Sequence, residues 1–198
     1  MTILVTGGAG FIGSHFTRRM VNHGRRVVVL DKLTYAGNLE NLKDVTEDSK
    51  KSKLFKFYKG DICDQGLVER ILSEESLDTI VNFAAESHVD RSISCASTFI
   101  DTDMKGVFVL LEASKKFGIK KFIQISTDEV YGTAHHGAFK ETDALNPSNP
   151  YSASKAGGDR LAYAYWVTYK LPVIITRASN NYGSYQYPEK FIPLFITN

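Results

Sequence analysis

Residues 6–14 read TGGAGFIGS, a glycine-rich stretch between a short apolar run and an amphipathic one. Gly7, Gly10 and Gly13 recur there at intervals of three residues. Glycines at this spacing allow a tight strand-to-helix turn and let a pyrophosphate approach the backbone, where the free N–H groups of a helix N-terminus favour an anion. An ordinary turn would also accept glycine, so the stretch predicts a dinucleotide site only together with its neighbours.

An acidic residue stands at the expected distance from these glycines. Asp31 follows the next apolar run, about 20 residues after the turn. A carboxylate at this place can accept hydrogen bonds from both hydroxyls of a ribose and would repel a 2′-phosphate, which favours NAD over NADP. Lys32 would favour the phosphate, but we expect its side chain to point into solvent.

Short β-branched runs alternate with amphipathic stretches along the chain, the pattern of a parallel sheet covered by helices on both faces. The expected strands are 3–6, 26–30, 54–59, 79–83, 121–126 and 173–177. The expected helices are 11–23, 65–74, 97–116 and 150–169. The sequence therefore predicts an α/β fold, a doubly wound parallel sheet of the Rossmann type.

Composition and charge exclude several classes of partner. The 198 residues carry a net charge of +2, too small a surplus to favour nucleic acid or a membrane surface. Cys63 and Cys95 match no metal-site spacing, so we expect no metal and two free thiols in a reducing cytoplasm. The N-terminus lacks the basic and apolar segments of a signal peptide, and no apolar run reaches the length of a membrane span.

Further strand ends carry residues suited to a cofactor and to chemistry. Asp61, in GDI, could accept a hydrogen bond from an adenine amino group, and the small residues of FAAES would let a cofactor pass close to the backbone. The run ISTDEVYG leaves two carboxylates, Asp128 and Glu129, behind a buried strand and beside Thr127. Because ligands of this fold bind beyond the carboxyl ends of the strands, these side chains should lie close together.

A tyrosine and a lysine four residues apart open the last expected helix. In YSASK, Tyr151 and Lys155 share one helix face. A free phenol is a poor base near neutral pH, but an ammonium group and a positively charged nicotinamide ring would lower its pKa. Tyr151 could then take a proton from a sugar hydroxyl while hydride leaves the same carbon for NAD. A surface tyrosine with a lysine one turn away is the alternative, which the glycine turn and the STDE run disfavour.

Together these segments resemble the extended short-chain dehydrogenase/reductases and, among them, the dTDP-glucose 4,6-dehydratases. The matching segments are TGGAGFIGS, DKLTYAGN, GDICD, AAESHVDRSI, STDEVYG, NPYSASKA and SNNYG…YPEKFIP, from residue 6 to residue 193. AAESHVDRS and STDEVYG are specific to these dehydratases, whereas the glycine motif and YxxxK are shared by many relatives. Members usually carry Asn at the position of Asp103, where the resemblance implies support for a proton relay to Lys155, and the carboxylate adds a charge there.

The resemblance implies a role for each polar residue of the expected active site. Thr127 hydrogen-bonds the sugar 4-hydroxyl, Tyr151 is the base at that oxygen, and Lys155 holds the nicotinamide ribose. Glu129 removes the hydrogen from C5 once C4 is a ketone. Asp128 protonates the departing 6-hydroxyl, for which a dry site must keep its carboxyl protonated. The expected activity is NAD-dependent dehydration of dTDP-glucose to dTDP-4-keto-6-deoxyglucose.

The motifs and the resemblance together supply the expected ligand-binding residues. For NAD these are Gly7, Gly10, Phe11, Ile12, Gly13, Asp31, Lys32, Leu33, Thr34, Asp61, Ile62, Ala84, Ala85, Ser87, Thr102, Tyr151, Lys155 and Asn180. For the sugar nucleotide they are Ser87, Thr127, Asn181, Glu189 and Lys190. Without the resemblance, Glu189 and Lys190 would be interpreted as an exposed ion pair.

The expected organisation is one cofactor domain followed by the beginning of another. Residues 1–178 would form the NAD-binding domain, and residues 179–198 the start of a truncated sugar-nucleotide-binding region. Gly183, Pro188 and Pro193 indicate irregular backbone in this last part. The chain then stops in an apolar run with nothing to pack against, as expected for a fragment of a longer protein.

The sequence leaves alternatives open for function and for assembly. A sugar-nucleotide 4-epimerase shares the glycine turn and YxxxK, but it has no use for Asp128 and Glu129. A truncated NAD-binding protein without turnover is the other alternative, suggested by the length and by Asp103. The helices expected at 97–116 and 150–169 resemble those of a four-helix dimer interface in this family, so we expect a homodimer in preference to a monomer.

Overall fold

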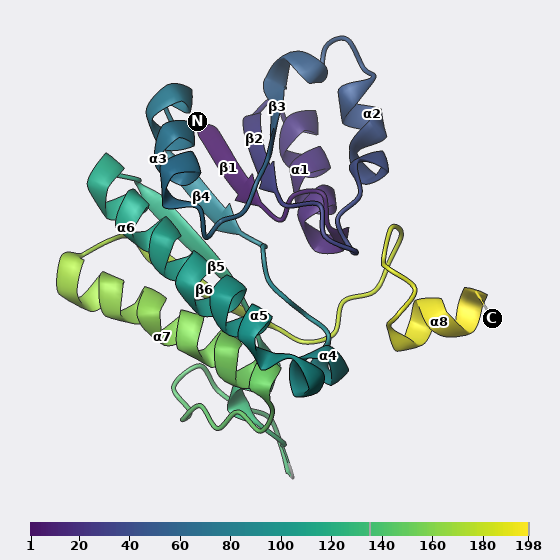
Figure 1. Ribbon diagram of the computed structural model, residues 1–198, viewed down its shortest axis with the longest axis vertical. Helices are drawn as coiled ribbons and strands as arrows, with labels where there is room; N and C mark the ends of the chain where they lie inside the picture. The colour runs from purple at the N-terminus through teal and green to yellow at the C-terminus, as the bar shows by residue number, and fades with distance from the viewer. Residues whose placement is uncertain (135, 198) are drawn as a thin grey trace.

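The computed structural model describes residues 1–134 and 136–197 and centres on a six-stranded parallel sheet in the order β3-β2-β1-β4-β5-β6 (Figure 1). The strands are β1 Thr2–Thr6, β2 Arg26–Asp31, β3 Phe55–Lys59, β4 Thr79–Asn82, β5 Lys121–Thr127 and β6 Val173–Ala178. The strand order reverses between β1 and β4, which forms the crevice where ligands of such sheets bind. The predicted Rossmann-like fold is confirmed, and no boundary of the six expected strands is displaced by more than one residue.

Helices cover both faces of this sheet. They are α1 Phe11–Asn22, α2 Lys43–Thr46, α3 Gln65–Glu75, α4 Val89–Ser94, α5 Ala96–Ile100, α6 Val107–Phe117, α7 Pro150–Tyr169 and α8 Phe191–Thr197. Neighbouring residues of a strand point to opposite faces, so Ile3 and Val5 pack with Val21 of α1 while Leu4 packs with α3 and α6. Two apolar cores therefore hold the sheet rigid, and its carboxyl edge is a fixed platform for a site.

The helix expected at 97–116 is interrupted in the structure. A π-helical stretch, η3 Asp101–Gly106, separates α5 from α6. A π-turn inserts an extra residue into the helix and is common at functional sites. Here Asp103 is only 2% exposed and accepts hydrogen bonds from the Glu86 N–H and the Ser154 hydroxyl. Apolar periodicity predicted one continuous helix because it carries no information about these tertiary contacts.

The segment after β6 is extended and then helical. Irregular backbone is confirmed up to Lys190, but α8 was not expected, and the prediction is wrong for 191–197. Pro193 lies in the first turn of α8, where its missing N–H costs no helical hydrogen bond. No residue of α8 is buried, and the helix lies apart from the sheet (Figure 1). Asn198, which closes the predicted second region, lies outside the described residues.

Within the two described ranges, none of the helices has both the length and the apolar character that crossing a lipid bilayer requires.

Candidate active site

The carboxyl ends of the strands open into a cavity of about 650 Å³. Its walls come from the glycine turn, the ends of β2 to β6, the start of α7 and the segment after β6. Every expected catalytic, cofactor-binding and substrate-binding residue lines this cavity except Leu33 and Asp128. The fold thus brings together residues spread over most of the chain, while their assignment to particular ligands stays a prediction.

The glycine turn forms a backbone surface that side chains could not share. Gly7 has a φ of +65°, and a Cβ atom there would lie 2.6 Å from the Ala84 nitrogen. A Cβ on Gly13 would lie 2.2 Å from the Gly7 carbonyl oxygen. Gly10 precedes α1 without a side-chain cap, so the first N–H groups of the helix face the cavity side with no protein acceptor from a capping side chain. This arrangement suits a phosphate.

Asp31 is held in one orientation at the end of β2. Its Oδ2 accepts a hydrogen bond from the Ala9 N–H at 2.9 Å, and its Oδ1 accepts one from the Leu33 N–H at 2.8 Å. Leu33 therefore acts on Asp31 through its backbone and does not line the cavity. The side chain of Asp31 is 8% exposed and fixed beside the glycine turn, the arrangement that ribose recognition needs.

Lys32 does not simply point into solvent, as the sequence suggested. Its Nζ lies 2.7 Å from Asp61 Oδ2, and this contact raises the pKa of Lys32. The pKa of Asp61 is lowered, because burial, which raises it, is outweighed by hydrogen bonds from the Cys63 N–H and from Lys32. Lys32 and Asp61 both line the cavity, as does Asp31. One oxygen of Asp61 is thus already occupied, so the expected contact to adenine has to share this carboxylate.

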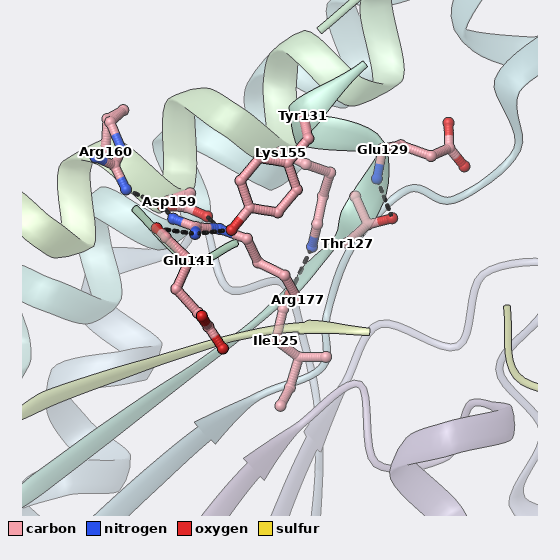
Figure 2. Close-up of polar contacts among 9 residues, drawn as sticks. All are labelled: Ile125, Thr127, Glu129, Tyr131, Glu141, Lys155, Asp159, Arg160 and Arg177. Atoms are coloured by element: carbon pink, nitrogen blue, oxygen red, sulfur yellow. Dashed lines mark hydrogen bonds and ion pairs between the residues drawn. The ribbon is translucent and has the colours of Figure 1, made fainter. Parts of the chain in front are cut away.

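Thr127, Tyr151 and Lys155 meet where β5 ends against the start of α7. Lys155 is 5% exposed, and its Nζ donates to the Ile125 carbonyl oxygen at 2.8 Å (Figure 2). Thr127 Oγ1 accepts a hydrogen bond from the Glu129 N–H at 3.2 Å, which starts the turn η4 Asp128–Tyr131. Asn149 caps α7 with a capping box and so fixes the first turn, in which Tyr151 stands.

Burial and the surrounding charges together set the pKa of Tyr151. Burial raises the pKa of Tyr151, and the carboxylates of Glu129 and Asp103 raise it further, while a hydrogen bond with Thr127 lowers it. Burial lowers the pKa of Lys155, and Asp103 and Asp159 partly offset this. Desolvation and the nearby carboxylates thus outweigh the hydrogen bond with Thr127 in the described chain. The expected lowering of the Tyr151 pKa by Lys155 together with a positively charged nicotinamide ring stays a prediction. A positive charge in the cavity would favour the ionised form of Tyr151.

The two acids of STDE differ in their surroundings. Glu129 is half-buried, lines the cavity and lies 3.5 Å from the Asn149 amide. Asp128 is exposed, is absent from the cavity wall and accepts a hydrogen bond from Thr127 Oγ1 at 3.3 Å. The expected dry surroundings of Asp128 concern the state with substrate bound and stay a prediction. A ligand lying against this turn would desolvate Asp128.

The segment after β6 supplies the far wall of the cavity. Glu189 and Lys190 do not form the exposed ion pair that the sequence alone suggested. Glu189 accepts a hydrogen bond from the Tyr35 hydroxyl at 3.1 Å and lies 3.9 Å from Arg91, and Lys190 donates to the Ser87 carbonyl oxygen at 2.8 Å. Sequence reasoning missed Tyr35 and Arg91 as site residues, although both lie in quoted motifs, DKLTYAGN and AAESHVDRSI. Their contacts attach this segment to the rest of the site.

Comparison with known proteins identifies the family. The model of the family described as GDP-mannose 4,6 dehydratase matches residues 4–198. The chain belongs to this family. It is 50% identical to a dTDP-glucose 4,6-dehydratase of Streptomyces niveus over 204 residues, covering 100% of this chain and 59% of that protein. Across similar curated relatives, the chain spans 57% to 62% of their length.

Solved structures of enzymes that act on sugar nucleotides superpose closely on this chain. The dTDP-glucose 4,6-dehydratase DesIV of Streptomyces venezuelae, crystallised with NAD, superposes with a TM-score of 0.94 at 51% identity and covers 100% of this chain and 62% of that one. A UDP-glucose 4-epimerase of Thermotoga maritima superposes with a TM-score of 0.86 at 34% identity, covering 96% and 59%. Both alternatives for function share this fold, so the residues of the site have to separate them.

Proposed function

We propose that this protein catalyses the NAD-dependent dehydration of dTDP-glucose to dTDP-4-keto-6-deoxyglucose. The observation that carries the proposal is the meeting of Thr127, Glu129, Tyr151 and Lys155 in the same cavity as the glycine turn. A base for an alcohol oxidation and a base for an elimination thereby face one space. Because the chain spans less than two thirds of its relatives' length, the activity of the whole protein and its substrate are part of the proposal.

The residues present fit NAD. The glycine turn and the start of α1 would hold the pyrophosphate, and Asp31 would accept the ribose hydroxyls. Ser126 adds a further observation: its Oγ is buried, has no partner in the described structure and belongs to a residue of the cavity wall. A buried hydroxyl of this kind needs a hydrogen-bonding partner, which the cofactor or the sugar would provide.

The chain's own residues divide the work at three sugar atoms. Tyr151 takes the proton from the 4-hydroxyl, which Thr127 orients. Glu129 removes the hydrogen from C5, made acidic by the adjacent ketone, and Asp128 gives a proton to the departing 6-hydroxyl. Bound NAD would accept hydride from C4 and return it to C6, and its positive ring would favour ionisation of Tyr151. When hydride reaches C6, Glu129 gives the proton back to C5.

The exposure of Asp128 limits when it can act as an acid. A general acid must carry a proton, and desolvation or a neighbouring negative charge favours the protonated form of a carboxyl. In this proposal the sugar nucleotide covers η4 and brings Asp128 out of water beside Glu129. Substrate contacts would come from Ser87, Asn181, Glu189 and Lys190, with Lys190 as a point charge for a diphosphate.

A sugar-nucleotide 4-epimerase is the second candidate, favoured by the epimerases of the same fold. Tyr151, Lys155 and the glycine turn would serve either reaction. Glu129 argues for dehydration, because epimerisation at C4 requires no base at C5.

We also propose, from exposed aromatic side chains on α6 and α7, that the protein is a homodimer, and, from the free thiols of Cys63 and Cys95, that it acts in the cytoplasm.

The dehydration is tested by incubating the protein with NAD and dTDP-glucose and measuring formation of the 4-keto-6-deoxy product. Glu129→Gln should lower the rate by about a hundredfold or more, the size of a general-base contribution, while NAD binding stays unchanged. Unimpaired turnover of Glu129→Gln would remove its role. If no 4-keto-6-deoxy product forms from dTDP-glucose, but the protein converts UDP-glucose to UDP-galactose, the protein is an epimerase.

A further inference from the structure

A buried ion pair links two of the elements that carry site residues. Asp159, on α7, is 0% exposed and faces Arg177 near the end of β6. Arg177 donates from Nε to Asp159 Oδ2 at 2.8 Å and from Nη2 to Oδ1 at 3.0 Å. Two parallel hydrogen bonds of this kind fix the guanidinium group in direction as well as in distance. The pair therefore holds α7 and β6 in one relative position.

The same guanidinium also holds the turn that carries the two acids. Arg177 donates from Nη1 to the Tyr131 hydroxyl at 2.5 Å (Figure 2). Tyr131 is the last residue of η4, which begins at Asp128. At the other end of η4, the Thr127 hydroxyl accepts the Glu129 N–H. Glu129 thus stands in a short turn that is hydrogen-bonded at both ends.

The backbone beyond this turn leaves it little freedom to shift. Gly132 follows with a φ of +84°, and a Cβ there would lie 2.4 Å from the Asn146 carbonyl oxygen. The Asn146 N–H in turn donates to the Val130 carbonyl oxygen at 2.9 Å. The Tyr131 ring stacks on Phe139, with centroids 5.1 Å apart. The hydrogen bond to the Tyr131 hydroxyl therefore adds to these contacts in holding η4 in place.

On α7, the pair lies next to the other half of the catalytic groups. Asp159 is one helical turn beyond Lys155 and two turns beyond Tyr151, so the three share one face of the helix. None of Tyr131, Asp159 and Arg177 lines the cavity. They can affect a reaction there only through the residues that they hold.

We propose that Arg177, Asp159 and Tyr131 are positioning residues that keep the Glu129 turn in register with Tyr151 and Lys155. This inference rests on the proposed function, in which Tyr151 and Glu129 act on adjacent carbons of one sugar. The two groups must then serve a single bound pose, and a shift of about 1 Å between them can cost a factor of about a hundred in rate. Arg177 touches both elements directly, Asp159 on α7 and Tyr131 on η4.

A pair of matched variants tests this role. Tyr131→Phe removes the hydroxyl but keeps a ring that can stack on Phe139. Arg160→Gln is the control, because Arg160 donates to Asp159 Oδ1 at 2.7 Å from a half-exposed position and is not hydrogen-bonded to Tyr131 in the described chain. We expect Tyr131→Phe to lower kcat about tenfold with an unchanged KM for dTDP-glucose. Arg160→Gln should leave both unchanged.

Amide hydrogen exchange of residues 128–132 is the second readout and needs neither cofactor nor substrate. Tyr131→Phe should speed exchange there about tenfold, the effect of one lost hydrogen bond to a charged group, and Arg160→Gln should not. If the wild-type protein shows no turnover, the proposed function is wrong. Amide exchange would in that case still measure how the hydrogen bonds of Tyr131, Arg177 and Asp159 hold η4. The inference is overturned if Tyr131→Phe changes only one of kcat and exchange, or neither, or if Arg160→Gln has the same effects.

Discussion

Replacing Asp103 by asparagine should change how the stability of the protein depends on pH. Asp103 Oδ1 accepts the Glu86 N–H at 3.1 Å and Oδ2 accepts the Ser154 hydroxyl at 2.7 Å. Burial raises the pKa of Asp103 from 3.8 to about 6, although the charge of Lys155 and these hydrogen bonds lower it. Asparagine keeps the shape and an acceptor for Glu86 but has no charge, so the exchange isolates the effect of ionisation.

The sign follows from the direction of the pKa shift. The folded protein binds this proton more tightly than the unfolded chain, so the contribution to stability is complete below about pH 4 and is lost as the pH rises through about 6. A difference of about 2 pKa units corresponds to about 3 kcal/mol at about 1.4 kcal/mol per unit. Asp103→Asn should therefore gain about 3 kcal/mol in unfolding free energy relative to wild type between about pH 4 and about pH 8.

Urea unfolding of both proteins across this pH range measures the difference. Groups that do not interact with Asp103 titrate alike in both proteins and cancel, whereas the pKa of Lys155, which Asp103 raises, is lower in the variant. Asp101→Asn, an exposed carboxylate in the same π-helical stretch, is the matched control and should show no pH-dependent difference from wild type. A stability difference for Asp103→Asn that stays constant with pH, or shrinks as the pH rises, would refute the reasoning.

Two further predictions concern the cofactor turn and the assembly. Gly13→Ala places a Cβ 2.2 Å from the Gly7 carbonyl oxygen, so calorimetry should detect no NAD binding. Gly66→Ala, whose Cβ has its nearest neighbour at 3.5 Å, is the control and should bind NAD as wild type does. Equal affinities of the two variants for NAD would contradict the role of the glycine turn in holding the pyrophosphate. Trp166, 51% exposed on α7 beside the 45% exposed Tyr163, should lie in the dimer interface, so Trp166→Glu should yield monomers by light scattering after gel filtration. A wild-type monomer would reject the interface.

Local patterns predicted the fold and the residues at the strand ends, whereas the residues after β6, such as Glu189 and Lys190, were predicted from the family resemblance. Alternation of strands and helices sets the sheet, and the sheet brings strand ends such as Asp31 and Thr127 together. The π-helical stretch around Asp103 was not predictable, since apolar periodicity is nearly the same in α- and π-helices over a few residues. The same limit applies to the contact of Lys32 with Asp61, which joins the ends of different strands.

Charge states were predicted less well than positions. The pKa of Tyr151 depends on the sum of burial and of surrounding charges, and the sequence showed Lys155 four residues away but not the closeness of Asp103 and Glu129. Similarly, adjacency in the sequence suggested one environment for Asp128 and Glu129. The turn η4 instead directs Glu129 to the cavity wall and leaves Asp128 exposed.

The fate of the hydrogen on C4 of the sugar tests the central claim most directly. The protein is incubated with NAD and dTDP-glucose carrying deuterium at C4, and the products are analysed by NMR. Dehydration moves this label from C4 to C6, since hydride leaves the first carbon and returns to the second, and we predict a 4-keto product with deuterium in its 6-methyl group. Label that is retained at C4 of an epimerised or unchanged sugar would contradict the account.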